Sequence, residues 1–206
     1  KVLFVLPSNS YIAYSNDNLA TNSVVAELLA GKVPVMSAAD LYLNEHREYG
    51  LSTYSLHSDG SGVCYSSRLR PILNMRPKYR HWLSPSLWQL NADLHLTDWL
   101  EEKNIDFDVM TDEDLHVEGV DLLNRYQVVL TGSHPEYSSE KMLAAYESYQ
   151  LNGGRWIYLG ADGFYWISEY HPDNLNIIEV RKGEAGTRAW TANPGEYNNA
   201  FDGKFG

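Results

Sequence analysis

Short apolar runs separated by longer amphipathic segments dominate the second half of the chain. Four runs have the length and composition of buried β-strands: residues 2–6, 106–110, 128–130 and 156–159. A weaker apolar stretch, residues 177–180, predicts a further strand. Runs this short and this apolar are typical of parallel strands covered on both faces.

Helical periodicity fills the intervals between these strands. Residues 92–103 place Leu94, Leu96, Trp99 and Leu100 on one predicted stripe. Residues 111–114 resemble a capping box that opens a short helix, and 117–124 predict another helical turn. A helix from Ser138 to about Leu151 shows Met142, Leu143, Tyr146 and Tyr149 on one face, and Gly153-Gly154 ends it.

This alternation predicts an α/β fold with right-handed crossovers. We expect a three-layer sandwich with a mostly parallel sheet, flavodoxin-like or class I glutamine-amidotransferase-like. The chain is interpreted as a single domain, residues 1–206, with its βα core at 91–182 and an irregular tail at 183–206. Residues 7–90 are poorly periodic but rich in aromatic and apolar residues, and they predict a long ordered insertion or lid after the first strand. Because the chain starts directly on a strand, we expect it to be a segment of a longer polypeptide.

The composition of the chain argues against several classes of binding partner and of site. The formal net charge of −11 over 206 residues argues against nucleic acid or an anionic membrane as a main partner. The chain has no apolar run of the roughly 20 residues that a membrane span needs. A lone cysteine, Cys64, excludes a disulfide or a cysteine-based zinc site within the chain, and a cytoplasmic location is expected.

Polar residues cluster after the predicted strands. Residues 131–137 read Thr-Gly-Ser-His-Pro-Glu-Tyr and follow the strand at 128–130. In an open α/β sheet, ligands bind at the carboxyl edge of the strands. His134 and Glu136 are therefore candidates for acid/base or metal chemistry, and the alternative is an ordinary helix start, where acids are favoured. Residues 8–14 and 160–166 should reach the same edge.

Three further features carry a functional and an ordinary interpretation. Asp162 lies between Gly160 and Gly163 in a turn that suits a close ligand, or a plain Asx turn. Cys64 lies in the long insertion, where a packed thiol is expected rather than a nucleophile. Among the 15 tyrosines are Tyr11, Tyr14 and Tyr54. As phenolates, such side chains would suit a hard cation such as ferric iron, whereas ordinary core or surface packing covers most aromatic residues.

Four stretches together resemble the large (β) subunit family of N,N-dimethylformamidase. They are residues 131–137, 158–166, 50–63 and 68–77. The resemblance extends from residue 2 to about residue 206, and it implies hydrolysis of dimethylformamide to dimethylamine and formate. It also implies a mononuclear ferric iron held by two tyrosines and one glutamate.

Transferred to this sequence, the resemblance assigns the glutamate to Glu136 and one tyrosine to Tyr54. The other tyrosine falls at Tyr14, in preference to Tyr11. His134 matches a histidine beside the iron. Asp162 stands where the family usually has asparagine, so hydrogen-bond donation by an amide at this position is lost when the aspartate is ionised. A small amide substrate, a smaller partner subunit and a homo-oligomer are implied in the same way.

The competing hypothesis is a non-catalytic domain that binds a ligand or carbohydrate through its 6 tryptophans and many tyrosines. A cysteine-dependent hydrolase is a third, weaker possibility. Phe164, Tyr165 and Trp166 are candidate walls of a pocket for a small uncharged substrate.

Overall fold

β1 (Val2–Leu6) is an inner strand of a four-stranded parallel sheet in the order β3-β1-β4-β6. Its partners are β3 (Phe107–Thr111) and β4 (Val128–Thr131), and β4 pairs in turn with β6 (Arg155–Ile157). The computed structural model describes residues 1–19, 23–59, 61–82 and 86–181, and the predicted tail at 183–206 lies outside them. All four strongly apolar runs are therefore confirmed as strands of one parallel sheet.

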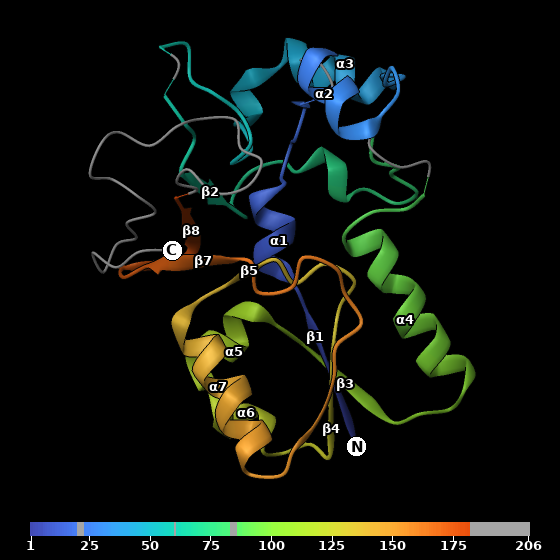
Figure 1. Ribbon diagram of the computed structural model, residues 1–206, viewed down its shortest axis with the longest axis vertical. Coiled ribbons are helices and arrows are strands. Elements are labelled where there is room, and N and C mark those ends of the chain that lie inside the picture. The colour runs from blue at the N-terminus through green and yellow to red at the C-terminus, as the bar shows by residue number, and fades with distance from the viewer. Residues whose placement is uncertain (20–22, 60, 83–85, 182–206) are drawn as a thin grey trace.

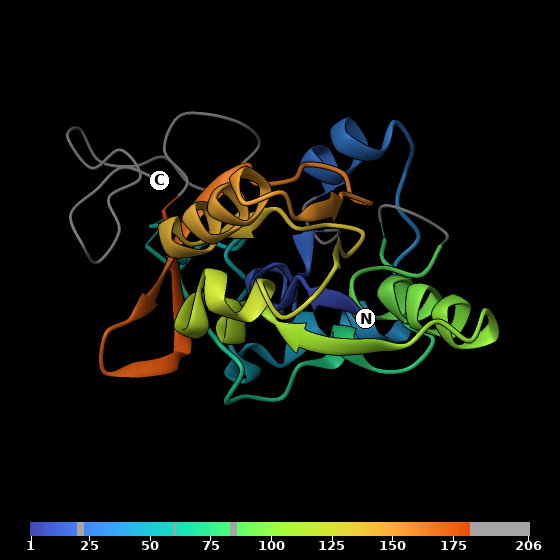
Figure 2. The same ribbon diagram turned by 90° about the horizontal axis from the view of Figure 1, so that it is seen from below.

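Helices cover both faces of this sheet (Figure 1). On one face, α4 (Leu90–Glu102) packs Leu100 against Phe4 and Leu130. On the other face lie α5 (Asp112–Glu118), α6 (Val120–Leu123) and α7 (Glu140–Leu151). Their core includes Leu3, Val5 and Val129, so successive residues of each strand point to opposite layers. Figure 2, seen from below, keeps α4 well apart from α7.

The predicted insertion, residues 7–90, contains more regular structure in its described residues than its sequence indicates. Its elements are α1 (Ser8–Ala13), α2 (Ser23–Ala30), α3 (Ala38–Glu45), β2 (Tyr65–Ser67) and the short 3₁₀ turns η2 (Arg47–Tyr49) and η3 (Leu73–Met75). The helices are short, and α1 and α3 contain Ser, Asn or Asp among their apolar residues, which hides them from periodicity. Figure 1 shows α1 continuing upward from β1 toward α2 and α3.

A second, mixed sheet lies beyond the carboxyl edge of the first one. Its order is β2-β8-β7-β5, with β5 (Tyr137–Ser138), β7 (Trp166–His171) and β8 (Asn174–Val180). The predicted strand at 177–180 is confirmed as the end of β8. β7 was not predicted, because its buried face consists of Trp166, Ser168 and Tyr170 and includes a polar residue.

Two helix details differ from the sequence analysis. Leu94 and Trp99 of α4 are about half exposed, and the buried positions toward its start are Asn91 and Asp93. α7 begins at Glu140 after the cap Ser139, rather than near Ser138, because residues 137–138 pair with β7 instead. The capping box at Thr111 and Asp114 is confirmed. None of the helices in the described residues combines the length and apolarity needed to cross a bilayer.

Candidate metal centre

The turn after β4 is held in place by close backbone packing. A side chain at Gly132 would place its Cβ 2.5 Å from Pro7 Cδ and 2.8 Å from Asp93 Oδ2. The amide of Ala161 donates to Ser133 O (3.1 Å), and the amide of Phe164 donates to Pro135 O (2.8 Å). The turns after β4 and β6 therefore form one unit at the carboxyl edge of the sheet. The convergence that the sequence predicted for this edge is present.

Glu136 lies at the centre of a buried polar cluster. The residue is 6% exposed. Each of its two carboxylate oxygens has two polar neighbours. Oε2 accepts from the Tyr14 hydroxyl (2.7 Å) and lies 2.9 Å from His134 Nε2. Oε1 accepts from Trp166 Nε1 (3.1 Å) and lies 3.3 Å from the Tyr54 hydroxyl. A carboxylate with polar contacts to both oxygens is held in one orientation.

Tyr14 and Tyr54 come from separate segments of the insertion and meet beside Glu136. Tyr14 caps the end of α1, and Tyr54 lies in a turn fixed by the Thr53 amide, which donates to Ala13 O (3.1 Å). The two rings stack with centroids 4.4 Å apart, and their hydroxyl oxygens are 2.5 Å apart. Three oxygens from three segments, on Tyr14, Tyr54 and Glu136, thus converge in the structure.

Tyr11 lies apart from this cluster. Its hydroxyl donates to Asp93, which also accepts from the Ser133 amide (2.6 Å). Burial raises the pKa of the Asp93 carboxyl, and the hydrogen bonds from Tyr11 and Ser133 act in the opposite direction. Of the two tyrosines that the sequence offered for this position, Tyr14 contacts Glu136, and Tyr11 supports the turn that carries His134.

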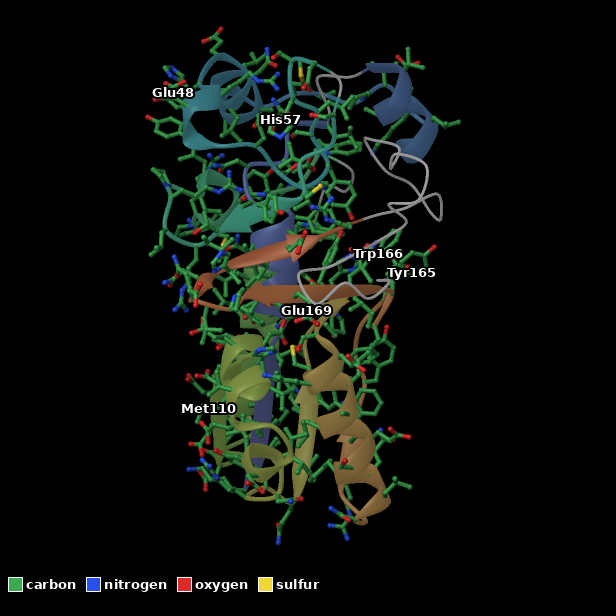
Figure 3. All side chains as sticks on the ribbon, turned by 90° about the vertical axis from the view of Figure 1, so that its left-hand side faces the viewer. Glu48, His57, Met110, Tyr165, Trp166 and Glu169 are labelled. Atoms are coloured by element: carbon green, nitrogen blue, oxygen red, sulfur yellow. The ribbon has the colours of Figure 1, made fainter. Side chains whose placement is uncertain are left out.

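Tyr137 and Trp166 close the cluster on the side of the second sheet. They are paired residues of β5 and β7, and the Tyr137 hydroxyl lies 2.6 Å from that of Tyr54. Figure 3 shows Trp166 at the start of β7, between the layer that carries Met110 and the upper part that carries Glu48 and His57. The centre therefore lies at the junction of the parallel sheet, the second sheet and the insertion.

An aromatic wall covers another side. Trp88 packs against His134 with ring centroids 5.0 Å apart, and it stacks on His81 at 4.9 Å. His81 is fixed by Asp17, whose carboxylate lies 2.9 Å from its Nε2. The indole N–H of Trp88 is buried and finds no acceptor among the described residues. A buried donor without an acceptor, next to His134, is a feature that a ligand can explain.

The remaining candidates lie outside the cluster. Asp162 is exposed at φ 49° in the turn after β6, and no hydrogen bond joins it to Glu136 in the described residues. Cys64 is partly buried, and its Sγ lies 3.6 Å from Gly62 O, as expected of a packed cysteine. Phe164 packs on Trp156 and Tyr146, and Tyr165 is about half exposed. Of the three proposed wall residues, Trp166 contacts Glu136.

Burial controls the protonation of the phenols. It raises the pKa of Tyr14 well above the usual range, and the neighbouring Tyr54 and Glu136 add to the effect. Burial, together with the charge of Glu136, also raises the pKa of Tyr54 well above the usual range, although the hydrogen bonds with Tyr137 and Tyr14 lower it in part. Without a cation, both side chains are therefore neutral phenols that share their protons with Glu136.

The donor set suits a hard cation. The oxygens of Tyr14 and Tyr54 lie 2.5 Å apart, and those of Tyr14 and Glu136 lie 2.7 Å apart, with protons between them. A cation would replace these protons and bring the charge that buried phenolates need. Across the described parts of the chain, no group of three or more His, Cys, Asp or Glu side chains could hold a metal. This centre instead draws two of its three oxygens from tyrosine.

Comparison with known proteins identifies the family. A family model described as N,N-dimethylformamidase beta subunit-like, C-terminal, matches residues 1–206. The chain belongs to this family. The N,N-dimethylformamidase beta subunit of Paracoccus aminophilus is 48% identical over 207 residues, which cover 100% of this chain and 27% of that protein. The protein of the same name from Alcaligenes sp is 46% identical over 206 residues, again 100% and 27%.

The chain spans about a quarter of the length of these N,N-dimethylformamidase beta subunits. Their names describe one component of a multi-subunit enzyme. The resemblance inferred from the sequence is thereby confirmed at the level of the family.

Sequence reasoning missed several residues that build the centre in this family member. Asp93 and Trp88 belong to no recognisable motif. Periodicity assigns Asp93 to a helix and Trp88 to the segment before it. Tyr137 adjoins Glu136 in the sequence, but its role depends on β5, a two-residue strand that no pattern indicates. Ser10, whose hydroxyl accepts from the Glu136 amide (3.0 Å), was hidden by the unrecognised helix α1.

Proposed function

We propose that this chain holds the catalytic centre of an iron-dependent amidohydrolase that cleaves a small amide such as N,N-dimethylformamide to dimethylamine and formate. The observation that carries the proposal is the convergence of the Tyr14, Tyr54 and Glu136 oxygens in one buried cluster. The names of the two relatives support the same class of substrate.

Tyr14, Tyr54 and Glu136 would hold a mononuclear ferric ion. Hard oxygen donors suit a small, highly charged cation, whereas soft metals prefer sulfur. When bound, the ion supplies a Lewis acid that polarises an amide carbonyl and lowers the pKa of water. Three protein ligands leave positions free for other molecules, as in catalytic metal sites generally.

His134 is placed to handle a proton. Its Nε2 lies 2.9 Å from Glu136 Oε2 and its ring lies against Trp88, so the imidazole is fixed at the edge of the oxygen cluster. Hydrolysis of an amide takes a proton from water and delivers one to the departing amine. We assign both transfers to His134, within reach of groups at the cluster.

Trp88 is suited to the uncharged end of such a substrate. Its ring forms an apolar wall, and its buried N–H lacks an acceptor among the described residues. An amide carbonyl is a suitable acceptor, and methyl groups on nitrogen suit an aromatic wall. Asp162 is a further candidate for contact with the substrate. Because it is exposed in the turn, a bound ligand or another segment would have to cover it.

Three broader expectations accompany this function. The strand order β3-β1-β4-β6, which is 2-1-3-4 along the parallel sheet, supports the narrower flavodoxin-like assignment. The name "beta subunit" supports assembly with a second, smaller subunit. The unbridged Cys64 agrees with a cytoplasmic location.

The experiment is metal analysis of the full-length protein purified with iron supplied, together with an optical spectrum and an assay of formate release. We expect about one iron per chain and a visible tyrosinate-to-iron charge-transfer band. Tyr54→Phe should lose most of the iron, the band and the activity. Tyr79→Phe is the matched control, because the Tyr79 hydroxyl is buried without a partner among the described residues and lies outside the cluster.

A colourless, metal-free wild-type protein that still releases formate would contradict the iron-dependent mechanism. Activity that survives Tyr54→Phe but is lost in Cys64→Ser would favour a cysteine hydrolase. Sugar binding that is unchanged by Glu136→Ala, with no metal and no hydrolysis, would favour a binding domain.

A further inference from the structure

The Tyr137 hydroxyl belongs to the oxygen cluster but is not one of its three proposed ligands. Its oxygen lies 2.6 Å from the Tyr54 oxygen, and the residue is fully buried. Tyr54 is therefore in contact with two hydroxyls, those of Tyr14 and Tyr137, and with Glu136. Tyr54 thus lies between the Tyr137 hydroxyl and the Glu136 carboxylate.

Counting protons fixes the direction of these hydrogen bonds. Each hydroxyl has one proton to donate. The Tyr14 hydroxyl donates to Glu136 Oε2 (2.7 Å), so the Tyr54 hydroxyl must donate in its 2.5 Å contact with Tyr14. The proton in the 2.6 Å contact between Tyr137 and Tyr54 then belongs to Tyr137. The chain of donors runs from Tyr137 through Tyr54 and Tyr14 to the carboxylate.

The position of Tyr137 is set by backbone pairing rather than by its contact with Tyr54. Residues 137 and 138 form β5, which pairs in parallel with the start of β7 at Trp166 and Ile167. The ring belongs to the buried cluster that contains Ile12, Ile178 and Val180. A donor held by a sheet and a packed core keeps its place when the group that it contacts changes its protonation.

We propose that Tyr137 is a positioning residue that donates a hydrogen bond to the Tyr54 oxygen and so makes Tyr54 a weaker, more stable anionic ligand than Tyr14. This inference rests on the proposed function, since it concerns the two phenols as ligands of iron. With iron bound, Tyr137 would still face the Tyr54 oxygen, because strand pairing and core packing hold it there. The two tyrosine ligands are then chemically unequal, although their residue type is the same.

Trp166 has the corresponding position toward the third ligand. Its Nε1 donates to Glu136 Oε1 (3.1 Å), and its Cα is the register partner of Tyr137. The short pairing of β5 with β7 thus presents two donors side by side, one for a phenol oxygen and one for a carboxylate oxygen. This arrangement explains why a two-residue strand interrupts the approach to α7.

The test compares Tyr137→Phe with the Tyr79→Phe control in the full-length, iron-loaded protein. Loss of a hydrogen bond to a phenolate makes the phenolate a stronger electron donor, so the charge-transfer band should move to longer wavelength. Iron affinity should fall about tenfold, because a hydrogen bond to a charged group is stronger than one to a neutral group. Tyr79→Phe should change neither the band nor the affinity.

A second measurement needs no variant. In deuterated water, the phenolate C–O stretch in the resonance Raman spectrum of the wild type should shift, since one phenolate accepts an exchangeable proton. An unmoved band in a folded, iron-loaded Tyr137→Phe protein would overturn the inference and leave the proposed function intact. Absence of a deuterium shift in the wild type would overturn it in the same way. A wild type that binds no iron would overturn both.

Discussion

Buried polar residues connect α1 to the carboxyl ends of β3 and β4. Asn9 and Ser10 of α1 are fully buried, and their polar groups reach Asp112 and Glu136. Asp112 accepts from the Asn9 amide (3.0 Å), and its own amide donates to Ser8 (3.1 Å). The carboxyl end of β1 is thus bound to the ends of β3 and β4 through hydrogen bonds that exclude water.

Asp112 should make the stability of the protein depend on pH. Burial raises its pKa to about 8. Between the pKa of an unfolded aspartate, about 3.9, and this value, the folded state holds one more proton than the unfolded state, so stability falls as the pH rises. Asp112→Asn should remove this fall, which reaches about 1.4 kcal/mol per pH unit. Urea unfolding between pH 5 and pH 7.5 measures it.

The control for this comparison is Asp98→Asn, because Asp98 is exposed on α4. We expect Asp98→Asn to keep the pH dependence of the wild type. Equal slopes for the wild type and Asp112→Asn would show that Asp112 is ionised in the folded protein.

At the scale of elements, the turn after β4 depends on a missing side chain. The space at Gly132 is filled by the Pro7 ring and the Asp93 carboxylate, both held by buried elements. Gly132→Ala should displace the turn, break the hydrogen bond from Ser133 to Asp93 and move His134 and Glu136. We expect a loss of about 1–3 kcal/mol in stability, as for overpacking generally, and a lower iron content by metal analysis.

Gly153→Ala is the control that separates displacement of the turn at Gly132 from a general loss of protein stability. Gly153 has φ 84° and nothing within 4 Å of an added Cβ, so alanine there adds backbone strain alone. It should destabilise the protein and leave the iron content per folded chain unchanged. If both variants lose iron equally, the turn at Gly132 has no specific role.

The same elements show how far the sequence determines the fold. Apolar runs predicted β1, β3, β4 and β6, and the two inner strands, β1 and β4, are mostly buried, as parallel strands covered on both faces are. The turn at 131–137 was predicted as part of a site because parallel strands share one edge. β5 was not predicted: Ser138 and Ser139 are equally good helix caps, and the choice of Ser139 is made by pairing of Tyr137 with Trp166. Where α7 begins is decided by a contact between distant segments, and a local sequence pattern carries no information about such contacts.

At the scale of the whole molecule, the oxygen cluster is a cross-link between distant parts of the chain. It joins residues separated by 40, 82 and 122 positions, at the end of α1, in the turn that carries Tyr54 and in the turn after β4. The insertion contributes Tyr14 and Tyr54, and Tyr54 lies in a turn that has no strand pairing to the parallel sheet. A cation bound at this centre would stabilise the position of the insertion on the core, and its removal should loosen all three segments together.

Hydrogen exchange of the full-length protein tests this coupling. A ligand that binds the closed state alone stabilises it by about 2.7 kcal/mol at a concentration 100 times its Kd, which slows exchange about 100-fold for amides that open with the site. We expect iron to protect residues 12–14, 52–55 and 134–137 by a common factor and to leave the end of α7, residues 147–151, unchanged. Tyr54→Phe should abolish the effect in all three segments, because the cross-link then lacks its ligand from residues 52–55. Protection confined to 134–137 would show that Glu136 binds the ion without the tyrosines, and the insertion would then be held by its own packing.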